Sequence, residues 1–272
     1  MLKLNISHKN GWGLNWAWDA FANGGVNPAD TLYGVTVAMA VDGLYRTYLL
    51  TGDRRYLETP TKALLDYADQ HSVQEGIFYF HYSDKAADQG YRVANITAML
   101  MVQYDTIGFA SNNVRLIDLA NQAYQGLMAD AKYSEQGMHW RYSGNAAKPR
   151  GNDLIHAAFI VYGLYRYCEA KGHDAESRGI LEQAVAYLDG FVADGKVWEF
   201  HVVEKPIPKN VRARSWAVGM LLVAKLVGKT GLVTQAQAVI PEYEFSPGQF
   251  SYRYGDALHS PRAVAFLLLG AA

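Results

Sequence analysis

Strongly apolar segments recur along the chain at a nearly regular spacing. Each is rich in small residues and would be apolar on nearly all sides as a helix, which is typical of a helix that is surrounded by protein. The five segments are residues 30–50, 92–107, 153–167, 212–227 and 259–269. The pattern therefore predicts five inner helices.

A second kind of segment lies between the apolar ones. In residues 54–70, 113–130 and 176–193, leucine and alanine recur every three or four positions while the other positions are mostly polar. Turn sequences such as Gly172-His173-Asp174 precede these segments and are suited to end one helix and cap the next. A helix with one apolar stripe covers its neighbours from outside, so the sequence predicts hairpins of one inner and one outer helix.

Each inner helix is preceded by an aromatic cluster that begins with glycine. The clusters read GLNWAW from Gly13, GIFYFHY from Gly76, GMHWRY from Gly137, GKVWEF from Gly195 and GQFSYRY from Gly248. We interpret them as short strands or loops at one end of the hairpins. A solenoid would also fit this repeat, but uniformly apolar inner helices favour closure. We therefore predict an all-α fold, an α/α toroid that forms an incomplete or small barrel.

Composition narrows the possible functions. The chain has 272 residues, half of them apolar and 19% charged, and its formal net charge is −1. It lacks the cation surplus that nucleic-acid binding needs, and its single cysteine excludes disulfides and multi-thiolate metal sites. No apolar run approaches the length of a membrane-spanning helix, so we expect no membrane insertion; the sequence leaves the localisation open. Because no linker interrupts the repeat, we expect a single domain over residues 1–272.

Polar residues at the predicted starts of the inner helices are the first candidates for a site. Residues three positions apart share one face of a helix, so both members of a pair could point into a common hollow. The pairs are Asp30 with Tyr33, Arg92 with Asn95, Asp153 with His156, Arg212 with Ser215, and His259 with Arg262. The aspartates could instead be ordinary first-turn acids, whereas arginine in a first turn opposes the helix dipole and needs another reason to be there.

The aromatic clusters suggest what such a hollow binds. Flat rings with polar residues between them suit the faces of sugars, which makes Trp16, Trp140 and Trp198 candidate subsites, although about half of the alternating aromatics should belong to the core. The chain has no phosphate loop, dinucleotide fingerprint, GxSxG or HExxH motif, so we expect no cofactor and no protein metal site. A metal held by Asp153, His156 and His259 remains an alternative.

Several segments resemble the α/α-toroid carbohydrate-active proteins: WDAF from Trp18, DTLY from Asp30, RGND from Arg150 and ARSWA from Ala213. That group includes unsaturated-uronyl hydrolases, uronate polysaccharide lyases, uronyl C5-epimerases and toroid proteins of exopolysaccharide biosynthesis loci. The RGN run resembles a motif of the uronyl hydrolases without the tryptophan that follows it there. Members usually have six or seven hairpins, and this chain has about four and a half.

The resemblance implies an enzyme acting on an acidic, uronate-containing polysaccharide or oligosaccharide. Such a ligand would be bound by the predicted cations Arg92, Arg212, Arg214 and Arg262. In β-elimination, His156 or His259 would be the base, Asn95 with an arginine would neutralise the carboxylate, and Tyr252 or Tyr142 would be the acid. In glycoside hydrolysis, Asp30 and Asp153 would serve as acid and base.

The number of cations favours elimination narrowly. The alternative from another class is a non-catalytic glycan-binding or assembly protein of an exopolysaccharide pathway. The half hairpin at the end of the chain could be completed by a partner subunit, because an uncovered apolar helix flank would otherwise face water, so a homo-oligomer is a further expectation.

Overall fold

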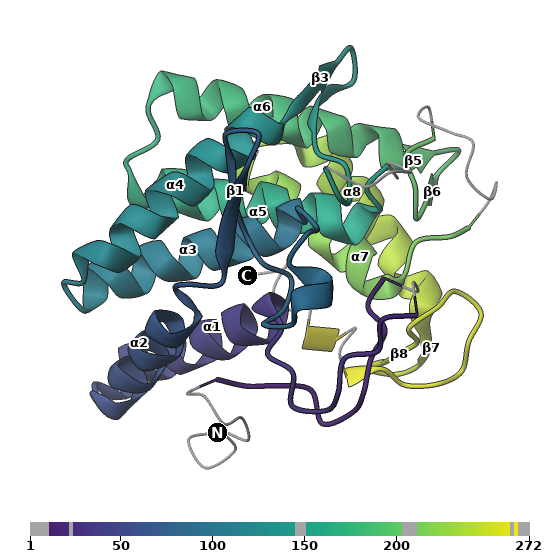
Figure 1. The fold of residues 1–272 in the computed structure, drawn as a ribbon. Coiled ribbons are helices and arrows are strands. Elements are labelled where there is room, and N and C mark those ends of the chain that lie inside the picture. Colours follow the sequence, from purple (N-terminus) through teal and green to yellow (C-terminus); the bar gives the residue numbers. More distant parts are fainter. Residues whose placement is uncertain (1–10, 22–23, 145–150, 203–210, 262–263, 266–272) are drawn as a thin grey trace. The chain divides into compact units, whose positions relative to one another are not determined.

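The computed structural model describes residues 11–21, 24–144, 151–202, 211–261 and 264–265 (Figure 1). The chain divides into two compact units, residues 1–130 with 143–148, and residues 131–142 with 149–272. Each unit contains two helix hairpins. That the whole chain is one domain stays a prediction.

The first unit shows the two predicted kinds of helix. Its helices are α1 (Gly34–Thr51), α2 (Arg55–Tyr67), α3 (Ala94–Ala110) and α4 (Val114–Asp130). Helix α1 packs on α2 and α3, and α3 packs on α4. Most of α3 is buried, including the polar Thr97, Gln103 and Asp105, whereas α4 buries one stripe that runs from Leu116 to Leu127. Inner and outer helices are thus distinguished by burial in α3 and α4, as the apolar pattern predicted. Helix α1 differs from that prediction, because it buries Val37, Val41 and Leu44 but exposes Met39, Leu49 and Leu50.

A β-hairpin joins the two helix hairpins of this unit. Strands β1 (His71–Gln74) and β2 (Ile77–Phe80) pair antiparallel, and a short 3-10 helix, η2 (Ala86–Asp88), follows them. The turn residues Glu75 and Gly76 have φ values of 54° and 79°, which is the backbone of a type I′ turn. The first aromatic cluster forms only isolated bridges, from Gly13 to Leu32 and from Trp18 to Asn27.

The second unit repeats this plan. Its helices are α5 (Leu154–Ala170), α6 (Ala175–Leu188), α7 (Ser215–Met220), which continues as the 3-10 helix η4 (Leu221–Val227), and α8 (Thr230–Val239). Its strands pair as β3 (Lys132–Ser134) with β4 (Gly137–His139), β5 (Val192–Ala193) with β6 (Lys196–Val197), and β7 (Glu244–Ser246) with β8 (Gln249–Phe250). Two further 3-10 helices are η3 (Asp189–Phe191) and η5 (Ile240–Tyr243).

Of the five glycines that mark the sequence repeat, Gly76, Gly195 and Gly248 lie in hairpin turns, Gly137 directly follows one as the first residue of β4, and Gly13 forms an isolated bridge. Gly76, Gly137, Gly195 and Gly248 all have positive φ, between 67° and 120°, which is a conformation that other residues adopt at a cost. In the turn between β5 and β6, Asp194 also has a positive φ, 53°. In four of the five clusters, the repeat glycine therefore provides the backbone conformation with which the chain turns into the aromatic strand.

Three inner helices begin later than predicted. The structure starts α1 at Gly34, α3 at Ala94 and α7 at Ser215, so Asp30, Arg92 and Arg212 precede the helices and do not stand in their first turns. Asp30 has a φ of 63°, and Arg212 forms a backbone bridge with Trp198. The prediction that Arg92 and Arg212 stand in first helical turns, where they would oppose the helix dipole, was therefore wrong.

The end of the chain and its membrane character complete the fold. Of the predicted fifth inner helix, residues 261, 264 and 265 are helical, and most of the segment lies outside the described residues. Within the part of the chain that the structure covers, no helix combines the length and apolar character needed to cross a membrane.

Candidate functional site

A histidine and an aspartate form the centre of a candidate site in the second unit. Asp153 is the N-cap of α5, and its Oδ1 accepts the backbone N–H of His156 at 3.1 Å and lies 2.5 Å from Nδ1 of the same residue. With Nδ1 donating to the carboxylate, the lone pair of the neutral ring is on Nε2. No described residue forms a hydrogen bond to Nε2. The cap thus presents a histidine nitrogen that is able to take a proton.

Asp153 stays ionised in this setting. Burial raises the pKa of its carboxyl, but the charge of His156, two hydrogen bonds from that residue and the charge of Arg214 together hold the pKa below its ordinary value. The side chains of Asp153 and His156 are 16% and 24% exposed. The pair is therefore reachable from solvent, and its carboxylate is suited to orient the ring and to stabilise a positive charge on it.

A buried ion pair lies beside this dyad. Glu199, which follows β6, is 4% exposed, and its Oε1 is 3.0 Å from Nη1 of Arg214. Its Oε2 accepts the backbone N–H of Arg214 at 3.1 Å, and its carbonyl accepts the backbone N–H of Leu154 at 3.0 Å. Glu199 thereby fixes the start of α7 to the start of α5. Burial raises the pKa of Glu199, and so does the charge of Asp153, while Arg214 opposes both.

Two tyrosines from loops adjoin the dyad and the cation of this site. The ring of Tyr142 meets the ring of His156 edge to face, with centroids 4.9 Å apart. The ring of Tyr252 lies 5.6 Å below the Cζ of Arg214, and its carbonyl accepts the backbone N–H of Ser215 at 3.2 Å. The structure thus brings together four residues that the sequence predicted for the site, Asp153, His156, Tyr142 and Tyr252, with Arg214 as a fifth.

Arg212 is engaged elsewhere. Its Nη2 is 2.5 Å from Oε2 of Glu242, its Cζ lies 4.4 Å above the ring of Tyr254, and its side chain is 14% exposed. An arginine that is paired with a carboxylate and stacked on an aromatic ring has few hydrogen-bond donors and little open surface available to a ligand. Arg214, which is 34% exposed, is the more open of the two cations.

The other predicted residues of this unit are spread over several environments. Trp140 is buried, Trp198 is half-buried beneath the Nζ of Lys196, and His259 is exposed, with its backbone bridged to Ser251. Arg262 lies outside the described residues. Their roles in binding stay predictions.

In the first unit, the predicted residues have mainly structural partners. Arg92 is buried, with Nη2 3.3 Å from the buried Asp130 and Nη1 3.1 Å from the exposed Glu75. Asn95 is buried, and its Oδ1 has no hydrogen-bond partner among the described residues, whereas Trp16 is exposed. Since Asp30 belongs to this unit and Asp153 to the other, their predicted pairing across a hollow stays a prediction.

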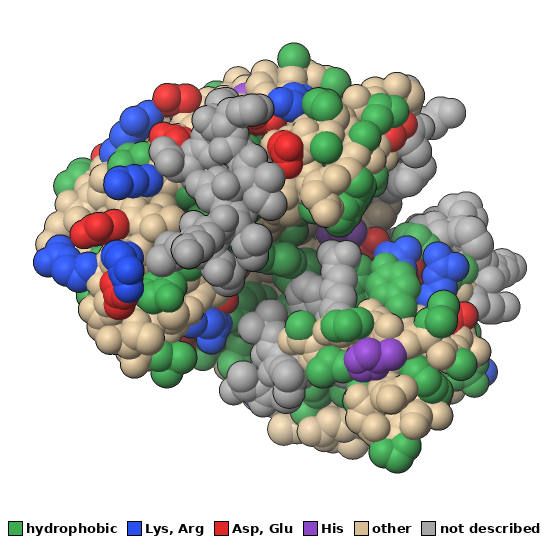
Figure 2. Space-filling model, turned by 90° about the horizontal axis from the view of Figure 1, so that it is seen from below, with side chains coloured by type: hydrophobic (Ala, Val, Ile, Leu, Met, Phe, Trp, Pro, Cys, Tyr) green, Lys and Arg blue, Asp and Glu red, His purple; other side chains and the backbone are tan. Residues whose placement is uncertain are grey.

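The distribution of charged side chains and the search for metal-binding groups both bear on the chemistry of the site. On the face seen in Figure 2, Lys and Arg side chains lie among Asp and Glu side chains. Among the described residues, no group of three or more His, Cys, Asp or Glu side chains is placed to hold a metal ion, so Asp153, His156 and His259 do not form the metal site that the sequence left open.

Glu199 was not among the predicted catalytic or substrate-binding residues, and the sequence suggested it only as an acid that could pair with the predicted arginines. Its signal was present, because it is the one acidic side chain within the aromatic clusters that follow the repeat glycines. Its contact with Arg214 crosses a loop, so no local pattern announces it.

Comparison with known proteins shows the fold. No protein-family model matches the chain, and the search of curated proteins found no match. Three similar solved structures are a D-mannose isomerase (11% identity, TM-score 0.68, 89% of this chain and 69% of that chain), the GH76 alpha-mannanase of Bacteroides thetaiotaomicron (12%, 0.65, 95% and 76%) and the cellobiose 2-epimerase of Bacillus thermoamylovorans (10%, 0.66, 89% and 75%). The chain has the α/α-toroid fold of these enzymes, as the repeat predicted.

Proposed function

We propose that this protein is an enzyme acting on acidic, uronate-containing sugar chains, and that its reaction begins when His156 removes the carbon-bound proton beside the uronate carboxylate. The observation that carries the proposal is the Asp153–His156 pair with Arg214 held next to it. A base and a guanidinium group close together suit a substrate in which one carbon carries both the acidic hydrogen and the carboxylate group.

The base is prepared by its capping interaction. Asp153 holds the His156 ring through Nδ1, which leaves the Nε2 lone pair for the substrate. When Nε2 takes the proton, the ring becomes a cation 2.5 Å from an ionised carboxylate, and this stabilises the charged intermediate state of the enzyme. The hydrogen bonds from His156 and the charge of Arg214 also lower the pKa of Asp153 and so favour its ionised form before the ring takes the proton.

The cation is needed because a carbon acid beside a carboxylate is weak. Removing its proton places further negative charge on the carboxylate, and a guanidinium group can share that charge through paired hydrogen bonds. Glu199 binds one Nη atom of Arg214 and its backbone N–H, so the rest of the guanidinium group is oriented and available for a ligand. Glu199 acts here as a positioning residue.

Elimination needs an acid as well. The electron pair of the broken C5–H bond would form a C4–C5 double bond, the bond from C4 to the glycosidic oxygen would break, and that oxygen would take a proton from Tyr142 or Tyr252. The two tyrosines adjoin the base and the cation respectively. If the proton returned to the other face of C5, the same first step would give epimerisation.

Hydrolysis is less well supported by the second unit. A glycosidase uses two carboxyl groups that both reach the sugar. In this site Asp153 is engaged with His156, and both carboxylate oxygens of Glu199 are bound to Arg214 in a buried position. Of the three similar structures named above, two are an isomerase and an epimerase by name, which supports a sugar rearrangement on this fold, and the third is a mannanase.

The experiment is an assay on a panel of polyuronates with the wild type, His156→Asn and a matched histidine control, His71→Asn, in strand β1 of the first unit. We expect an unsaturated product that absorbs in the ultraviolet, formed by the wild type and by His71→Asn, and lost in His156→Asn. Reducing ends without that absorbance would indicate hydrolysis and contradict the proposal. Binding without any turnover would return the protein to the class of glycan-binding proteins.

A further inference from the structure

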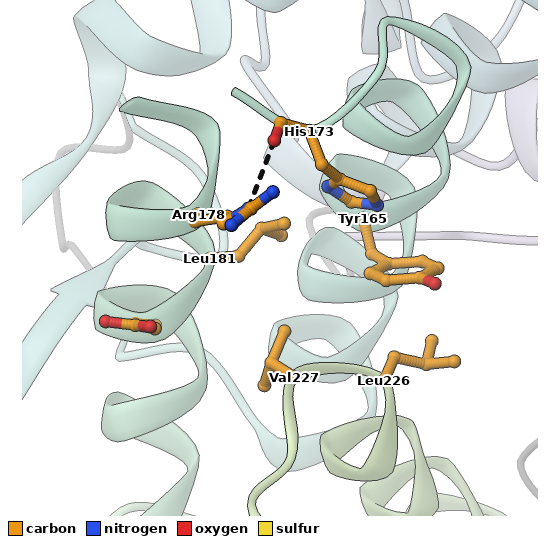
Figure 3. A pocket seen from close by; sticks show the side chains of 7 residues that line it. Tyr165, His173, Arg178, Leu181, Leu226 and Val227 are labelled. Atoms are coloured by element: carbon orange, nitrogen blue, oxygen red, sulfur yellow. Dashed lines mark hydrogen bonds between the residues drawn. The ribbon is translucent and has the colours of Figure 1, made fainter. Parts of the chain in front are cut away.

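A pocket of about 310 Å³ lies in the second unit at the end of α5 that is remote from Asp153 (Figure 3). It is formed where the last turns of α5, the start of α6 and the end of η4 meet. His156 is nine residues from the lining residue Tyr165 along α5, which corresponds to about 14 Å at 1.5 Å per residue. The pocket is therefore separate from the candidate catalytic site.

One part of the pocket is apolar and aromatic. Tyr165 presents its ring, with the ring of His173 5.1 Å away and tilted by 45°, and Leu181, Leu226 and Val227 supply aliphatic surface. The Tyr165 hydroxyl donates to Glu169 Oε1 at 3.2 Å, which restrains the ring. A restrained ring beside aliphatic side chains suits a flat ligand face made of C–H groups.

The polar part carries one cation and one anion. Nε of Arg178 donates to the carbonyl of His173 at 3.1 Å, as Figure 3 shows, and this fixes the arm of the guanidinium group. Its two Nη atoms have no hydrogen-bond partner among the described residues. Glu182 follows one helical turn later and likewise makes no ion pair with a described residue. The guanidinium group of Arg178 and the exposed carboxylate of Glu182 thus offer hydrogen-bond donors and acceptors one helical turn apart.

We propose that this pocket is a second carbohydrate-binding site, which takes a neutral pyranose residue of a sugar chain. The sugar would lay a C–H face on Tyr165 and the aliphatic side chains, and would exchange hydroxyl hydrogen bonds with Arg178 and Glu182. An anionic ligand would meet the carboxylate of Glu182, and a cationic one the guanidinium of Arg178, so a neutral polyhydroxylated ligand fits best.

The size agrees with such an occupant. Small-molecule sites generally enclose roughly 300–1,000 Å³, so this pocket is at the lower end, as expected for one or two sugar rings. Its place away from His156 means that it would hold a chain on the protein without taking part in the reaction. The site does not depend on the proposed chemistry, since a glycan-binding protein without activity could use it equally.

The test is a titration with the methyl glycosides of glucose, mannose and galactose. NMR of the protein, labelled at leucine and valine methyl groups, monitors the binding. We expect one of these glycosides to shift the methyl signals of Leu181, Leu226 and Val227. Arg178→Gln should weaken that binding about tenfold, since hydrogen bonds to a charged group are being removed. Gln183→Ala, an exposed neighbour of Glu182 that does not line the pocket, is the matched control and should leave the affinity unchanged.

A second variant covers the aromatic part. Tyr165→Ala should weaken the same glycoside at least as strongly, and thermal melting would establish that the variant is folded. The proposal is overturned if no glycoside shifts these methyl signals, if both variants bind as the wild type does, or if the free uronic acid binds here more tightly than the neutral sugars. His156→Asn should bind the glycoside normally at this pocket, so failure of the catalytic proposal would be seen separately.

Discussion

The arginine that faces the substrate can be identified by removing it. Arg214→Ala eliminates a guanidinium group that is 34% exposed, 3.0 Å from Glu199 and stacked 5.6 Å from the ring of Tyr252. If its open edge binds the uronate carboxylate, the substitution should weaken acidic oligosaccharides and leave neutral ones nearly unaffected. The two ligand classes therefore provide an internal comparison within one variant.

The expected size follows from two contributions. A hydrogen bond to a charged group contributes about 1.5–3 kcal/mol, which corresponds to a loss of affinity of about 10- to 150-fold for the acidic ligand. The variant also leaves Glu199 buried without its cation. Breaking a fully buried pair costs about 3–5 kcal/mol, and since Arg214 is partly hydrated we expect a loss of about 1–3 kcal/mol in the free energy of unfolding.

The double variant Glu199→Gln/Arg214→Ala separates these contributions. It removes the stranded carboxylate, so stability should recover toward that of the wild type, while the affinity for acidic oligosaccharides should stay low. Affinity is measured by isothermal titration calorimetry with matched acidic and neutral oligosaccharides, and stability by urea unfolding. Equal losses for both ligands, or recovery of acidic binding in the double variant, would refute the role assigned to Arg214.

Three further predictions concern the first unit and the turns. Arg92→Met should lower the free energy of unfolding by about 3 kcal/mol because Asp130 is buried, whereas Glu75→Gln should cost less than about 1 kcal/mol; similar losses in urea unfolding would contradict this. Burial, and secondarily a neighbouring histidine, lower the pKa of His81 to about 4 from 6.5, so the unfolded state binds the proton first and stability should fall by up to about 1.4 kcal/mol per pH unit as pH drops through this window. His81→Gln should flatten that dependence, and a curve parallel to the wild type would disprove the assignment. Gly195→Ala, at φ 67°, should lower stability by about 1–2 kcal/mol; an unchanged melting temperature would contradict the turn geometry.

The sequence predicted those parts of the fold that local rules determine. A glycine with positive φ lies in or directly after each of the four hairpin turns, so the spacing of Gly76, Gly137, Gly195 and Gly248 was enough to identify the repeat. Burial on all sides or on one stripe likewise follows from helix periodicity. Helix starts were less predictable, because Asp30 and Arg212 are held by backbone bridges and turns that depend on tertiary pairing.

The site residues likewise divide into those that local spacing predicts and those that depend on tertiary contacts. Asp153 and His156 are three residues apart at a helix start, so the sequence predicted that they share one face, and the contact between them is local. The choice between Arg212 and Arg214 was not predictable, because it depends on Glu242, which is 30 residues from Arg212 along the chain. Of the four arginines expected to bind the ligand, Arg92 is paired with Glu75 and Asp130, Arg212 is paired with Glu242, and Arg262 lies outside the described residues, which leaves Arg214.

The most direct test of the central claim follows the hydrogen at C5 of the uronate. NMR of the uronate chains after incubation in deuterated water with the wild type or with His156→Asn shows whether that hydrogen has been lost from the carbon. We expect its loss, by elimination or by exchange with deuterium, in the wild type and its retention with His156→Asn. Wild-type products that all keep the original C5 hydrogen would contradict the assignment of His156 as the base.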